Sequence, residues 1–342
     1  MNHTSIINPS VTFFRNYEES ILQTRKSLFE ELDGISTDFG NEARKILETK
    51  LRSNNNTPLL GELFPWIIKD LVNANIESTH KISVGWLAIY LYTLFLDEHV
   101  DNPKPLEPNK FLAGSLLAKT GLLQISRFTN NTPYENSIDK AFSFSAKNQQ
   151  LDTKFQKEKT ETDFKEKYSE GKNHIVLVCA GALAAENSKH AEFITTFTKN
   201  LLLTLQYLDD IADYQEDFAS DNFTVLLNDA FKNNSELNLL LKPNTNRELL
   251  RELVVTGALQ RVVEKIISLL NQSILLIKNE AKIDLGTSKS AVDFFLTLHT
   301  YCTSLNNLLR INQNSFRSFP PKKQSVILDK IENHITIIAQ ST

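Results

Sequence analysis

Residues 199–224, KNLLLTLQYLDDIADYQEDFASDNFT, place a cluster of carboxylates directly after an apolar run. The acidic residues are Asp209, Asp210, Asp213, Glu216 and Asp217. Like charges four residues apart destabilise a helix by roughly 0.2–0.5 kcal/mol per pair, and acidic groups at a helix C-terminus oppose its dipole. A hard divalent cation reverses the sign of these terms, because Mg²⁺ prefers oxygen ligands. The segment therefore indicates a site for a divalent cation.

A second acidic segment occurs earlier, in YLYTLFLDEHVDN. Asp97 and Asp101 are four residues apart and share a helix face, with Glu98 beside them. The same face continues back through Tyr90 to Trp86, which predicts an aromatic and apolar lining. Each cluster alone is also typical of a solvated acidic helix end. Two such clusters, each ending a mostly apolar helix, favour a metal site.

The spacing within the later segment predicts which side chains would face the metal. Asp209, Asp213 and Asp217 follow one another at i, i+4 and i+8, so one helix presents them as a strip. Gln206 extends this strip toward the apolar part of the helix. Mg²⁺ is usually held by one or two carboxylates together with substrate phosphates. The two clusters therefore suit a ligand with a diphosphate head and a hydrocarbon tail.

The elements that must position these residues are helices. The chain of 342 residues is 41% hydrophobic and 23% charged, and its 10 Gly and 10 Pro leave few places for turns. Helical periodicity dominates, and no window shows the alternation of a strand. The segment 147–167 is polar, so it predicts either a loop or a solvated helix face. The helices are expected at 11–32, 41–51, 59–73, 81–101, 110–128, 137–146, 168–186, 191–217, 223–231, 247–282, 289–309 and 322–340.

Composition excludes several classes of function. The formal net charge of −4 gives no basic footprint for nucleic acid. Cys179 and Cys302 lie in apolar contexts without metal-ligand spacing, so we expect free buried thiols in a reducing cytoplasm. The N-terminus lacks the pattern of a signal peptide, and no apolar run reaches the roughly 20 residues needed to span a bilayer. We expect a cytoplasmic protein without membrane insertion.

The acidic segments carry a resemblance to a known family. KNLLLTLQYLDDIADYQED resembles the second aspartate-rich segment of the trans-prenyltransferases, NLGxxFQxxDDxxD, and also the metal-binding triad of class I terpene synthases. The stretch LDDIADYQED is similar to the LDxxxDxxED stretch of the large terpene synthases. LDEHVDN resembles the first motif of the family, DDxxD, with Glu98 in place of the second aspartate. The two motifs occur in the family's order, about a hundred residues apart.

The resemblance implies an all-α fold, an isoprenoid-synthase-type helical bundle with a central apolar cavity, formed by one domain over residues 1–342. It implies three Mg²⁺ ions with a prenyl diphosphate substrate bound, and a possible homodimer. The implied metal ligands are Asp97, Glu98, Asp101, Asp209, Asp210, Asp213 and Asp217. The implied catalytic residues are five of these: Asp97, Asp101, Asp209, Asp213 and Asp217. The implied substrate-binding residues are Lys172, Gln206, Arg310, Trp86 and Tyr90.

Departures from the family pattern bear on the reaction. The arginine pair that holds the second, homoallylic diphosphate is missing after the first motif, where the chain reads NPKPLEPNKFLAGS. The basic N-terminal segment is also missing, since NNNTPLLGELFPW has no Lys or Arg. These losses favour a class I terpene synthase, which cyclises one allylic diphosphate of fifteen to twenty-five carbons. The alternatives are a chain-elongating trans-prenyl diphosphate synthase and a non-catalytic helical scaffold.

Two of the implied basic residues have an alternative interpretation. Lys172 corresponds to a lysine that grips the diphosphate, but it also fits a surface lysine at the start of a helix. Arg317 is an alternative to Arg310 as the arginine near the C-terminus.

Overall fold

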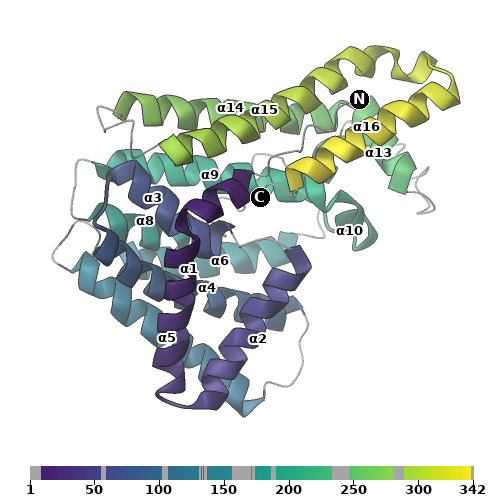
Figure 1. The fold of residues 1–342 in the computed structure, drawn as a ribbon. Coiled ribbons are helices and arrows are strands. Elements are labelled where there is room, and N and C mark those ends of the chain that lie inside the picture. Colours follow the sequence, from purple (N-terminus) through teal and green to yellow (C-terminus); the bar gives the residue numbers. More distant parts are fainter. Residues whose placement is uncertain are drawn as a thin grey trace.

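The computed structural model describes residues 9–54, 59–101, 107–130, 132, 134, 137–155, 171, 174–185, 190–232, 246–280 and 289–339. Every regular element in this part of the chain is a helix (Figure 1). The first half contains α1 (Pro9–Asp33), α2 (Thr37–Asn54), the π-helical turn η1 (Leu59–Leu63), α3 (Phe64–Val72), α4 (Ile76–Asp101), α5 (Pro108–Thr129), α6 (Ser137–Phe155) and α8 (Val176–Ala184). The second half contains α9 (Ala191–Ala212), α10 (Tyr214–Ala219), α11 (Val225–Lys232), α13 (Asn246–Val255), α14 (Ala258–Glu280), α15 (Lys289–Asn312), η3 (Gln313–Ser318) and α16 (Pro321–Ala339).

The helices pack into one bundle. Helix α14 packs against both α9 and α15, and the three helices lie in the upper part of Figure 1. On the other side α4 packs along α5, while α1 contacts both α2 and α4. Helix α8 contacts α4, α5 and α9, so it joins the two parts. The all-α fold class expected from periodicity is confirmed.

Two apolar clusters form the core. The larger one includes Trp66, Trp86 and Phe197, and it spans helices from both halves of the chain. The smaller one joins α1, α2, α4 and α5 through residues such as Leu28 and Leu87. Each fully buried large apolar side chain contributes about 1.5–3 kcal/mol relative to its exposed form. Helix α4 contributes to both clusters, which explains why its sequence is apolar almost all the way round.

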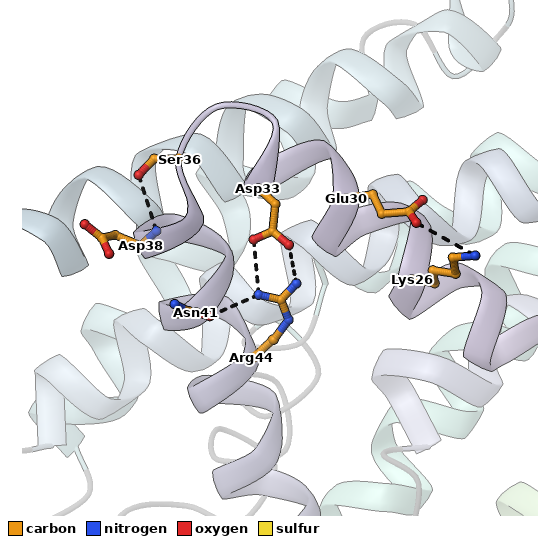
Figure 2. A network of polar contacts seen from close by, with 7 residues as sticks. All are labelled: Lys26, Glu30, Asp33, Ser36, Asp38, Asn41 and Arg44. Atoms are coloured by element: carbon orange, nitrogen blue, oxygen red, sulfur yellow. Dashed lines mark hydrogen bonds and ion pairs between the residues drawn. The ribbon is translucent and has the colours of Figure 1, made fainter.

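The turn between α1 and α2 is fixed by a polar network (Figure 2). Arg44 donates through both terminal nitrogens to the carboxylate of Asp33, and the same guanidinium donates to Asn41 Oδ1 at 3.2 Å. The backbone N–H of Asp38 donates to Ser36 Oγ at 3.3 Å. Bidentate pairing gives the Asp33–Arg44 pair a defined geometry. The network therefore sets the angle at which α2 returns along α1.

Two predicted helices are divided in the structure. The helix expected at 247–282 is interrupted at Gly257, whose φ of 74° is the left-handed conformation that glycine adopts without strain. The helix expected at 191–217 is interrupted at Asp213, with φ −102° and ψ 11°. Of the polar segment at 147–167, residues up to Phe155 belong to α6, so the helical interpretation is confirmed for that portion.

None of the helices within the described ranges has the length and hydropathy of a membrane span.

Candidate functional site

The acidic segment lies at the junction of α9 and α10. The backbone N–H of Asp213 donates to Asp209 O, and that of Asp217 donates to Asp213 O, each at 2.9 Å. The first of these bonds closes the last turn of α9 and the second closes the first turn of α10, so each aspartate lies one backbone turn from the next. That the three side chains share one face stays a prediction. Asp209 and Asp213 are exposed, and Asp217 is partly buried.

Asp210 has a different environment from its neighbours. Its side chain is 3% exposed, whereas Asp209 is exposed. Asp210 Oδ1 accepts a hydrogen bond of 3.0 Å from Gln206 Nε2, and Oδ2 accepts one of 2.9 Å from the backbone N–H of Val225. Val225 is the first residue of α11. The structure thus directs Asp210 toward the protein interior and Asp209 toward solvent.

Asp217 is held by the turn that follows α10. Asn222 Nδ2 donates to Asp217 Oδ1 at 2.7 Å, and the backbone N–H of Asn222 donates to Asp217 O at 2.8 Å. The turn passes through Asp221, whose φ of 54° lies in the left-handed region that aspartate tolerates better than most residues. Asn222 is not among the site residues that the sequence motifs predict. The DN pair after an acidic helix end is the turn signal that points to it.

The carboxylates influence one another's protonation. Burial raises the pKa of Asp210 to about 7; the charge of Asp209 adds to this, and the hydrogen bonds from Gln206, Leu226 and Val225 oppose it. Burial also raises the pKa of Asp217 to about 7, with a further rise from the charges of Asp210, Asp209 and Asp213, opposed by the Asn222 hydrogen bond. A cation bound at this junction would offset the charge repulsion, which adds to the larger effect of burial on these pKa values.

The donor set of the junction fits Mg²⁺ in its chemistry. Asp209, Asp213 and Asp217 offer hard oxygen donors on one stretch of chain, and the charges of Asp209 and Asp213 raise the pKa of Asp217. Within the described ranges, no three acidic, histidine or cysteine side chains converge on one metal position. Mg²⁺ does not require such a cage, because one or two carboxylates plus substrate phosphates usually hold it. Asp209 and Asp213, which face solvent, are the residues best placed to hold it.

Trp86 and Tyr90 contact the π-helical turn η1. Trp86 is 1% exposed, and its indole N–H donates to Leu60 O at 2.7 Å. The ring of Tyr90 lies where a side chain at Gly61 would stand: a Cβ there would lie 2.3 Å from Tyr90 Cε1. Tyr90 also packs against both apolar clusters. The two aromatic residues therefore stabilise the contact between η1 and α4, and their predicted contact with substrate stays a prediction.

The remaining predicted site residues are only partly described. The backbone of α4 extends to Asp101, but the side chains of Asp97, Glu98 and Asp101 lie outside the described part of the structure, as does the whole of Lys172. Arg310 lies exposed in the last turn of α15, and Arg317 lies exposed in η3. The structure thus brings together the second acidic cluster and Gln206, and the roles predicted for the other residues stay predictions.

Two surface depressions lie elsewhere. One of about 480 Å³ lies along α1 and is lined by residues between Arg15 and Lys26. The other, of about 360 Å³, lies between α2 and the start of α5, beside Arg44 and Asn109. Neither is lined by a residue of the acidic segment, so neither belongs to the candidate site.

No protein-family model and no curated protein sequence matches the chain. Solved structures do match its fold. The heptaprenyl diphosphate synthase from Staphylococcus aureus superposes with a TM-score of 0.62 at 12% identity, over 80% of this chain and 97% of that one. The geranylgeranyl pyrophosphate synthetase from the archaeon Geoglobus acetivorans superposes with a TM-score of 0.60 at 15% identity, over 83% of this chain and 97% of that one. The chain therefore has the helical fold of the isoprenoid synthases.

Proposed function

We propose that the protein is a Mg²⁺-dependent enzyme that acts on allylic prenyl diphosphates. The observation that carries this proposal is the α9–α10 junction, where Asp209, Asp213 and Asp217 occupy consecutive turns. This junction occurs in a chain with the isoprenoid-synthase fold and matches the aspartate pattern of that superfamily.

The chain's own residues would hold and orient the charged end of the substrate. Mg²⁺, when bound, supplies positive charge that stabilises a departing diphosphate. Asp209 and Asp213 would hold the ion from the exposed side of the junction. Asn222 fixes the orientation of the Asp217 carboxylate, so that group needs little reorganisation when a ligand arrives. The side chains of Asp97 and Asp101 are proposed to complete the site from α4.

The structural relatives support chain elongation better than the cyclisation favoured by the sequence. Both are prenyl diphosphate synthases by name. We therefore place a trans-prenyl diphosphate synthase first among the candidate activities. Such an enzyme joins an allylic diphosphate to isopentenyl diphosphate and releases pyrophosphate.

A specific observation keeps a terpene synthase as the second candidate. The segment in which the family resemblance predicts basic residues contains Glu62, which is 4% exposed. Arg25 of α1 binds this carboxylate through Nε and Nη2, at 2.5 and 2.6 Å. At this position, within the described structure, the charge of Arg25 is paired with Glu62 and so is not available to bind a second diphosphate. An enzyme that uses one allylic diphosphate does not require that patch.

Product analysis separates the two activities. Purified protein is incubated with Mg²⁺ and an allylic diphosphate of ten, fifteen, twenty or twenty-five carbons, with and without isopentenyl diphosphate. Longer diphosphates that form only with isopentenyl diphosphate support elongation. Cyclic or rearranged hydrocarbons formed from one substrate alone support a terpene synthase. If no substrate is consumed under any condition, the protein is a non-catalytic scaffold and the proposal is wrong.

A further inference from the structure

The N-terminus of α11 is capped by a residue from another helix. The first backbone N–H groups of a helix have no partner within the helix and need an acceptor. Here Val225 N–H donates to Asp210 Oδ2 at 2.9 Å, and the backbone of Leu226 also donates to this carboxylate. Asp210 belongs to α9, so it links two elements that are separated by the α10 turn.

The residue expected to cap this helix locally does not do so. Thr224 directly precedes α11, and threonine is a favoured residue at that position. Thr224 Oγ1 is buried and has no hydrogen-bond partner within the described part of the chain. The Asp210 carboxylate therefore replaces the local cap. The carboxylate also lies at the positive end of the α11 dipole, and this dipole stabilises its negative charge.

Both oxygens of Asp210 are engaged by the protein. Oδ1 accepts the hydrogen bond from Gln206 and Oδ2 accepts from Val225, and the side chain is almost completely buried. Asp209 and Asp213, on either side in sequence, are exposed. Sequence resemblance groups Asp210 with the metal ligands, whereas its contacts are those of a structural anchor.

We propose that Asp210 is a positioning residue: it anchors α11 to α9 and thereby holds Asp209 and Asp213 in register, and it does not ligate Mg²⁺. This inference rests on the proposed function for the part that concerns Mg²⁺. A second contact holds α11 in the same place: Phe218 of α10 stacks on Phe231 of α11, with ring centroids 6.1 Å apart. Without the anchor, the end of α9 that carries Asp209 and Asp213 would lose its attachment to α11.

Three variants test the proposal. Asp210→Asn keeps an oxygen for Val225 N–H, and its amide donates to Gln206 once that side chain rotates its amide by half a turn. Asp210→Ala removes both contacts. Asp213→Asn, the matched control, removes a charge from the exposed side of the same turn. The readouts are amide hydrogen exchange at Val225 and Leu226, and calorimetric affinity for Mg²⁺ with inorganic pyrophosphate as the probe.

We expect Asp210→Ala to accelerate exchange at Val225 and Leu226 by about tenfold, because the cap is lost. The same variant should weaken Mg²⁺–pyrophosphate binding, and Asp210→Asn should restore both properties to near the parent values. Asp213→Asn should weaken binding without changing exchange. The proposal is overturned if Asp210→Asn weakens binding as strongly as Asp213→Asn does while exchange stays at the parent rate.

The two proposals fail in different ways. If the parent protein does not bind Mg²⁺ with pyrophosphate at all, the proposed function is contradicted. Exchange at Val225 then still decides the anchoring: faster exchange in Asp210→Ala supports it, and unchanged exchange overturns it.

Discussion

Asn222 Nδ2 donates a hydrogen bond of 2.7 Å to Asp217 Oδ1, and so a turn residue fixes the last carboxylate of the acidic segment. The same residue's backbone N–H caps α10 through Asp217 O. Because Asn222 lowers the pKa of Asp217 against the effect of burial, it favours the charged form that a cation requires.

Asn222→Ala is expected to raise the pKa of Asp217 further, because the hydrogen bond that stabilises the carboxylate is lost. The pH dependence of Mg²⁺–pyrophosphate binding should therefore move to higher pH. Calorimetric titrations from about pH 6 to 9 measure this shift. Asn246→Ala is the control, since Asn246 donates to Gln215 near the same helix without touching Asp217. An unchanged pH profile in Asn222→Ala would show that the contact is not functional.

Asp209→Asn and Asp213→Asn are each expected to reduce turnover at least about 100-fold, because removal of a metal ligand weakens the charge stabilisation at the leaving group. Their melting temperatures should stay near that of the parent, since both side chains are exposed. Glu216→Gln is the matched control: Glu216 is an exposed acid of α10 outside the predicted ligand set. Near-normal turnover in either aspartate variant would contradict the metal assignment.

Stability without metal should fall as pH rises. The pKa of Asp210 is raised to about 7 from its ordinary 3.8, so between these values the folded state binds more protons than the unfolded state. The free energy of unfolding therefore decreases from about pH 4 to pH 7 and then levels off, with each pKa unit worth about 1.4 kcal/mol.

Asp210→Asn removes the contribution of Asp210 to the pH dependence of the unfolding free energy, because the amide does not titrate. The difference in unfolding free energy between parent and variant, from urea titrations with EDTA present, should change in the variant's favour from about pH 5 to 7. A difference that is constant over this range would show that the Asp210 carboxyl titrates equally in both states.

Arg25→Ala is expected to destabilise the protein by about 3–5 kcal/mol, because it leaves the buried carboxylate of Glu62 without its partner. The control is Lys26→Ala on the same helix, whose pair with Glu30 is exposed at 3.8 Å and contributes at most about 0.5 kcal/mol. Urea unfolding of both variants measures the two costs. Equal, small effects would mean that Arg25 does not neutralise Glu62 in the folded protein.

Much of the fold could be predicted from the sequence, because apolar residues recur at helical spacing through nearly the whole chain. The break at Gly257 was visible as a glycine within a helical pattern, whereas the break at Asp213 carries no glycine or proline signal. The end of α4 at Asp101 and the start of α9 at Ala191 coincide with the predicted bounds. The start of α4 and the end of α9 each differ from the prediction by five residues (76 against 81, and 212 against 217).

The candidate site was harder to predict. Spacing predicts that Asp209, Asp213 and Asp217 share one face. The structure links them by successive backbone hydrogen bonds but interrupts the helix at Asp213, so the shared face stays a prediction. The inward direction of Asp210 depends on where α11 lies relative to α9, which local sequence does not determine. The contact of Trp86 with Leu60 O likewise depends on the irregular turn η1.

Pyrophosphate release from an allylic prenyl diphosphate is the first measurement to make, because it depends on both the proposed substrate and the proposed metal site. Purified parent protein and Asp209→Asn are compared, each with Mg²⁺ and each with EDTA. We expect release only by the parent and only with Mg²⁺. Release that is equal in the parent and in Asp209→Asn, or that persists in EDTA, would contradict it.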